Sequence, residues 1–204
     1  MKLLASTAAI ALCLAASATA AQAQSLNNDQ RNNTNIRSQL NATIQDIGED
    51  VALTSASIAN SFTAEGGSLG ALNNYQNFWG DSRSGLSATI SDVSGDVSAT
   101  SAAIANSATV EADWVGALRN TQLAGFDPTA TLNATIVDID GDVAATSAAL
   151  SNSATFTTDF GSLASTQVNR AAVYAEVGST IRDVNGSVNA TAAAIGNSLT
   201  VTGF

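Results

Sequence analysis

Residues 132–155 read "LNATIVDIDGDVAATSAALSNSAT", and the chain contains three further stretches that repeat this pattern. The other copies begin at Leu40, Leu86 and Val177, so successive starts are 46, 46 and 45 residues apart. A shorter motif, Leu-x-(Asn/Ser)-x-Gln, keeps the same separations. A fixed period of this kind is typical of repeat proteins, whose units stack on one another to bury a common core.

Each copy opens with the alternation of a half-buried strand. Leu132, Ala134 and Ile136 share one face, Asn133 and Thr135 share the other, and the copies are rich in Thr, Val and Ile. An Asp-x-x-Gly turn follows in three copies; its Asp can bond the local backbone, and its Gly is free to take a positive φ. We therefore expect an all-β repeat β-solenoid of four units of about 46 residues, with two stacked rungs in each unit.

A helical pattern competes with this interpretation. Ile44, Ile47, Val51 and Ile58 follow one another at intervals of three, four and seven residues, which also suits one face of a helix. Asp142 could cap such a helix in the third copy. The alternative is therefore a strand-plus-helix repeat solenoid. The glycine in each candidate helix and the β-branched residues favour the all-β fold.

The amino-terminal residues predict export. Lys2 precedes an apolar run and the small-residue sequence Ala21-Gln22-Ala23, a pattern typical of a secretory signal peptide cleaved after Ala23. We expect a signal peptide at 1–23 and a single repeat domain at 24–204, and we place the protein outside the cell or on its surface without a membrane span. The predicted units are about 24–69, 70–115, 116–160 and 161–204.

Charge and composition exclude several functions. Residues 24–204 contain no Lys, Cys or His, and six arginines minus seventeen carboxylates give a formal charge of −11. Nucleic acids require clustered cations, so they are not expected partners. Ser-His and Cys-His nucleophiles are excluded, as are zinc sites built on histidine or thiolate. We expect a protein that is not an enzyme and that has no resident cofactor.

The acidic turns leave calcium as a candidate ligand. Asp138, Asp140 and Asp142 offer oxygen ligands in a glycine-containing turn, which suits a hard cation. The other copies vary this pattern, which favours a structural turn. Stacking of the first Asp of each copy would bring like charges together, and a bound cation could relieve their repulsion.

Amide side chains recur at equivalent positions and predict ladders that hydrogen-bond from unit to unit. The predicted ladder residues are Asn60, Asn106, Asn152 and Asn197 together with Gln30, Gln76, Gln122 and Gln167. Outward threonines form a second kind of row, a candidate face for ice or polysaccharide: Thr54, Thr100, Thr146 and Thr191. The least repeated segments hold the large aromatics, which we expect to cover an edge or a corner and which could alternatively bind sugar: Tyr75, Trp79, Trp114, Phe126 and Tyr174.

The segments "LNNYQ", "AAIANSATV" and "ATAAAIGNSLTVTGF" resemble secreted bacterial surface repeat proteins, in particular curlin-type fibre subunits and holdfast-anchoring proteins. The resemblance implies a cell-surface β-solenoid that self-associates, or that attaches the cell to a surface or biofilm matrix through another protein. Unpaired strand edges near residues 25–40 and 188–204 are the expected contacts. The alternatives are an ice- or polysaccharide-binding module and a calcium-stabilised repeat protein.

Overall fold

The computed structural model describes residues 25–203. Within this range the regular secondary structure consists of β-strands, and no helix is present. They are β1 (Ser25–Asn32), β2 (Ile36–Ile47), β3 (Val51–Phe78), β4 (Ser82–Val93), β5 (Val97–Ala124), β6 (Thr129–Ile139), β7 (Val143–Phe160), β8 (Leu163–Asn169), β9 (Tyr174–Val184) and β10 (Val188–Thr202). The helical alternative is therefore wrong for the described part of the chain. The predicted signal peptide at 1–23 lies outside it.

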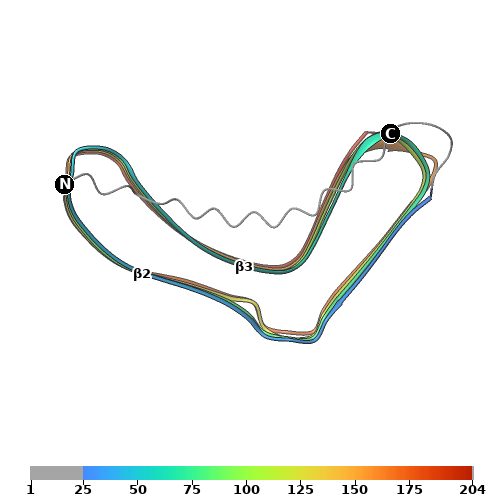
Figure 1. Cartoon of the computed structure of the whole chain (residues 1–204), viewed down its shortest axis with the longest axis horizontal. Helices are drawn as coiled ribbons and strands as arrows, with labels where there is room; N and C mark the ends of the chain where they lie inside the picture. The colour runs from blue at the N-terminus through green and yellow to red at the C-terminus, as the bar shows by residue number, and fades with distance from the viewer. Residues whose placement is uncertain (1–24, 204) are drawn as a thin grey trace, which may run out of the picture.

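The strands form two parallel sheets. One has the order β1-β3-β5-β7-β10, with β8 also beside β5, and the other has the order β2-β4-β6-β9. Successive passes of the chain superimpose on one closed outline (Figure 1). The two sheets face each other along one arm of this outline, and along the other arm the long strands turn back so that the first sheet faces itself. The layer that contains β3 bends toward the layer that contains β2. The outer face of the long strands β3, β5 and β7 is therefore concave.

The pairing register shows how far the chain travels before it returns beside itself. Leu40 pairs with Leu86 and Leu86 pairs with Leu132, which are steps of 46 residues, and Leu132 pairs with Val177 after 45 residues. The prediction of two rungs per unit is wrong, because each strand pairs with the strand one full unit away, 45 or 46 residues along the chain. We call residues 25–69, 70–115, 116–160 and 161–203 coils 1 to 4.

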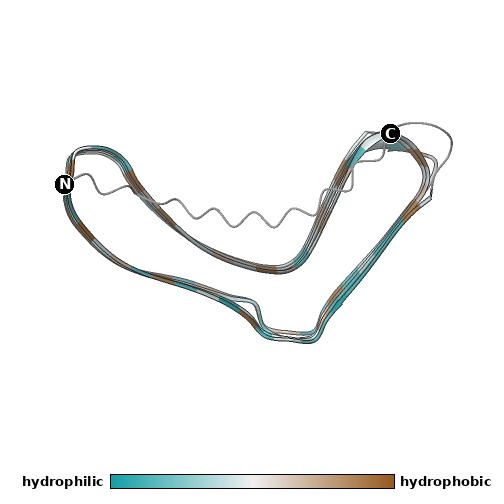
Figure 2. Ribbon diagram, viewed as in Figure 1, coloured by the Kyte–Doolittle hydropathy of each residue, from teal (hydrophilic) through white to brown (hydrophobic). Residues whose placement is uncertain are grey.

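The core fills the inside of the outline, partly between the two sheets and partly between facing stretches of the first sheet. β6 follows the predicted alternation, since Leu132, Ala134 and Ile136 are buried and Asn133 and Thr135 are exposed. Equivalent apolar residues of neighbouring coils pack on one another, and these apolar positions coincide around the outline (Figure 2). Full burial of a Leu or Ile side chain contributes about 1.5–3 kcal/mol, so stacking stabilises what one coil could not.

The turn between the sheets differs from expectation in one respect. The positive φ belongs to its first residue, Asp46, Asp92, Asp138 or Asp183, with values of 54–58°. Glycine recurs at the same position of the turn in coils 2 to 4 for another reason. A Cβ on Gly141 would lie 2.5 Å from the carbonyl oxygen of Gly95 in the coil before. Glycine is thus required by close approach between coils rather than by its own backbone conformation.

Candidate functional site: ladders and outer faces

The predicted asparagine ladder lies inside the stack, on a stretch where the strand turns two consecutive side chains inward. Asn60 donates to Asn106, Asn106 donates to Asn152 and Asn152 donates to Asn197, each over 2.8 Å. The second amide hydrogen of Asn106 goes to the carbonyl oxygen of Leu123 at 2.9 Å. These bonds satisfy buried polar groups and hold each coil in register with the next.

The glutamine ladder runs with the opposite polarity. Gln76 donates to Gln30 over 2.9 Å, and Gln122 donates to Gln76 and Gln167 donates to Gln122 over 2.8 Å. Each glutamine also donates to a backbone carbonyl on the facing stretch of its own coil; for Gln122 the acceptor is Ser153. This ladder therefore ties coil to coil and also one wall of a coil to the other.

Two further ladders were missed by the sequence interpretation. Asn28 donates to Asn74, Asn74 donates to Asn120, and Asn120 donates to the hydroxyl of Ser165. The position two residues before each ladder glutamine could have revealed this row. The second ladder lies in the turns. The carboxylate of Asp96 accepts a hydrogen bond from the backbone N–H of Asp142 at 2.8 Å, and the carboxylate of Asp50 accepts one from the backbone N–H of Asp96 at 2.9 Å.

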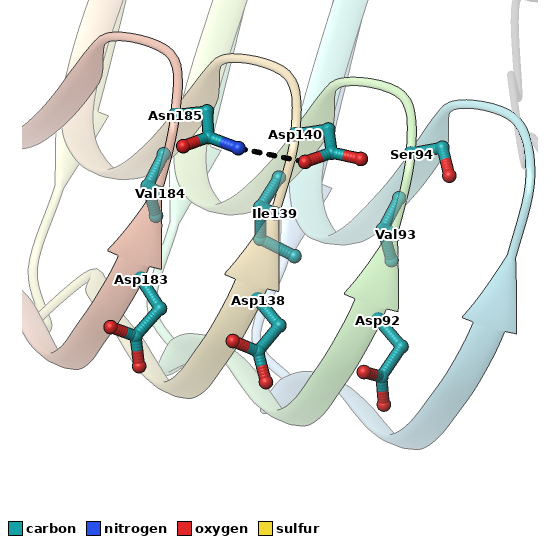
Figure 3. Close-up of a pocket in the computed structure, with 9 residues that line it drawn as sticks. All are labelled: Asp92, Val93, Ser94, Asp138, Ile139, Asp140, Asp183, Val184 and Asn185. Carbon is teal, nitrogen blue, oxygen red and sulfur yellow. Dashed lines mark hydrogen bonds between the residues drawn. The ribbon is translucent and has the colours of Figure 1, made fainter.

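The acidic turns form an open hollow (Figure 3). The carboxylates of Asp92, Asp138 and Asp183 form one row at the strand ends, while Asp140 and Asn185 lie in a second row, joined by a 2.8 Å hydrogen bond. Asp142 is bonded to the N–H of Ser187. Within residues 25–203 no group of three or more acidic, His or Cys side chains is placed to hold a metal ion, so the structure does not assemble Asp138, Asp140 and Asp142 into one donor set.

The outer face of the long strands carries uncharged rows. The predicted threonine row is in register from coil to coil, and it is followed by an alanine row and by a row of Ile58, Ile104, Leu150 and Ile195. Ile58 is 45% exposed. Segments 51–58, 97–104, 143–150 and 188–195 contain no charged residue. The outer face of the other sheet, by contrast, carries Arg83, Glu176 and Arg182.

Four of the five aromatics singled out from the sequence, Trp79, Trp114, Phe126 and Tyr174, are exposed, whereas Phe78 and Phe156 fill the core. Trp79 and Phe126 come from the corners of neighbouring coils, and their rings meet edge to face with centroids 6.0 Å apart. Trp114 is 44% exposed, and Tyr75 lies beneath the Arg31 guanidinium at 5.3 Å. Tyr174 donates to Glu176 at 2.6 Å, and this hydrogen bond raises the pKa of its hydroxyl. Sugar binding by these rings stays a prediction.

The family model described as holdfast attachment protein D matches residues 66–204, more than half of the chain. The chain belongs to this holdfast attachment protein D family. No curated protein and no solved structure matches it significantly.

Membership of the holdfast attachment protein D family implies an adhesive role at the cell surface and association with surface or matrix material. It supports the holdfast-anchoring part of the resemblance and gives no support to the curlin part. Among the described residues, none lies in a helix that could cross a bilayer. The signal-peptide cleavage site and the exact unit boundaries stay predictions.

Proposed function

We propose that the chain is a four-coil β-solenoid that acts without catalysis as an adhesive anchor of the holdfast, and that the uncharged outer face of its long strands is the contact surface. The observation that carries this proposal is the unbroken run of threonine, alanine and isoleucine or leucine rows on that face. In a chain of charge −11 between residues 24 and 204, an area without charge suits a neutral, extended partner such as a polysaccharide.

The four-coil arrangement is supported by the register. Pairing of Thr54 with Thr100, of Thr100 with Thr146 and of Thr146 with Thr191 brings the four threonines into one row. Adjacent strands in a sheet are about 4.8 Å apart, so the row spans roughly 15 Å with regularly spaced hydroxyl groups. Repetition allows a weak contact at each coil to add to the next along one polymer.

The test replaces Thr100 by Lys in the bacterium that makes the protein. A lysine in the middle of the row introduces a charge that a neutral partner must desolvate, so fewer cells should keep their holdfast under flow. Thr89→Lys is the matched control, because Thr89 is an outward threonine of the same coil on the opposite sheet. Retention of the holdfast by both variants, with normal amounts of protein on the surface, would exclude this face. Unchanged retention after removal of the gene would exclude the adhesive role.

An ice-binding face is the second candidate, favoured by the in-register threonine row. Ordered threonine hydroxyl and methyl groups at regular spacing could match the spacing of water molecules in an ice lattice instead of a polysaccharide. Thermal hysteresis and shaping of ice crystals by the purified protein would establish it, with Thr100→Lys abolishing both effects. Ordinary freezing behaviour at high protein concentration would remove it.

Calcium stabilisation remains a proposal for the acidic turns. If a cation lies between the stacked carboxylates of Asp92, Asp138 and Asp183, millimolar calcium should raise the Tm and a chelator should reverse the rise. Asp138→Asn should then abolish the calcium response. An identical Tm with calcium and with chelator would leave the turns with a structural role only.

A further inference from the structure

Coil 4 differs from the other coils in charge. Residues 161–204 contain two arginines and two acids and are formally neutral, whereas the units at 24–69, 70–115 and 116–160 carry −3, −4 and −4. Two copies of the protein that met through any of the first three coils would bring like charges together. Contact through coil 4 avoids this repulsion.

The start of the stack opposes continuation by another coil in the same register. A Cβ on Gly95 would lie 2.7 Å from the backbone nitrogen of Asp50, and Gly141 and Gly186 are equally close to the coils before them. The equivalent residue of coil 1 is Glu49. Its Cβ would collide with a coil placed before it, so a second copy cannot extend the stack there without displacing the turn.

At two positions the last described coil lacks a group that receives a following coil, although the asparagine and glutamine ladders continue into it at Asn197 and Gln167. The aspartates at positions 50, 96 and 142 accept an N–H from the next coil, but the equivalent residue of coil 4 is Ser187, whose side chain is shorter. The ladder of Asn28, Asn74 and Asn120 also ends in a serine, at position 165. Head-to-tail growth in the repeat register would therefore meet a steric clash at the first coil and lack two of the recurring contacts at the last described coil.

The edge strand β9 is self-complementary under a two-fold axis. It ends the sheet order β2-β4-β6-β9, so one edge of β9 has no strand beside it among residues 25–203. Antiparallel pairing about Ser179 would place Glu176 opposite Arg182 of a second copy, and Arg182 opposite its Glu176. The same register places Val177 opposite Ile181 on the core side.

We infer that two copies of the chain associate tail to tail, through antiparallel pairing of their β9 edges about Ser179, into a closed dimer. This inference goes beyond the adhesive function and does not depend on it. Ser179 gives independent support: coils 1 to 3 have alanine at its position, and its buried hydroxyl has no hydrogen-bond partner within the described chain. Across the two-fold axis, the two Ser179 hydroxyls can bond to each other.

The test is a charge swap followed by analytical ultracentrifugation of the exported protein. Glu176→Arg or Arg182→Glu alone places like charges opposite each other twice, which should weaken dimerisation about tenfold or more. The double variant restores two opposite pairs and should restore the dimer. Residues 176 and 182 are roughly 20 Å apart along one strand, so rescue cannot arise within a single chain. Arg37→Glu, on the edge strand β2 of coil 1, should leave dimerisation unchanged.

A single cysteine provides a second readout that does not depend on charge. Residues 24–204 contain no cysteine, so Ser179→Cys introduces one thiol, which should form a disulfide-linked dimer under mild oxidation. Ala134→Cys, at the equivalent position of coil 3, should dimerise without forming a disulfide link, because strands cover it on both sides. A protein that remains monomeric at high concentration, polymers that grow with concentration, or single and double variants with the same affinity would each overturn the inference.

Discussion

At the scale of single residues, a comparison of Gly141 with Gly48 distinguishes two reasons for glycine in a turn: a positive φ, and close contact with the neighbouring coil. Neither has a positive φ, but a Cβ on Gly141 would lie 2.5 Å from the carbonyl oxygen of Gly95, whereas nothing lies within 4 Å of a Cβ on Gly48. Gly141→Ala should lower the free energy of unfolding by about 2 kcal/mol through overpacking, and Gly48→Ala should change it little. Urea denaturation of both variants measures this. Equal losses would show that backbone conformation, not coil contact, selects the glycine.

The buried amide ladder makes a second prediction at this scale. Asn106 bonds to Asn60, Asn152 and Leu123, so Asn106→Ala leaves several buried groups without partners. The expected loss is about 2–3 kcal/mol. Asn60→Ala removes one ladder bond at the open end of the row and should cost about 1 kcal/mol. Urea denaturation measures the free energy of unfolding of both variants. Equal losses would contradict a ladder in which the middle residues make the most hydrogen bonds.

The acidic turns are elements whose stability depends on charge. Asp92, Asp138 and Asp183 stand in one row, so Asp138→Asn should raise the Tm at low ionic strength by removing repulsion, and the gain should shrink as salt is added. Asn also tolerates the φ of 58° at this position, whereas Asp138→Ala does not and should be less stable than Asp138→Asn. Thermal melts at two salt concentrations give both comparisons, and a Tm gain independent of salt would point away from repulsion.

The elements also show what the sequence could and could not predict. The strand at Leu132–Ile136 was predictable because its alternation reports directly which face is buried. The amide rows were predictable as positions, since the period places them in register, but their opposite polarities were not, because polarity depends on how each amide also meets the facing wall. The role of the turn glycines was assigned wrongly, since close approach arises only once coils are stacked.

At the scale of the whole molecule, a stack predicts a gradient of local stability. β5 has strands on both sides, whereas β1, β2, β9 and β10 each have one neighbour among the described residues. Hydrogen exchange should therefore be slowest in β5 and fastest in the first and last coils, measured at concentrations where the protein is monomeric. Uniform protection along the chain would indicate a single cooperative unit instead.

The central claim is that each coil of the stack takes one full period of about 46 residues. Residues 24–204 lack cysteine, so spin labels can be attached specifically at Thr54→Cys and Thr191→Cys. Double electron–electron resonance spectroscopy then measures the distance between the two labels. Three coil steps predict a backbone separation of roughly 15 Å. Two rungs per period would make six steps and roughly 29 Å, and that longer distance would contradict the account.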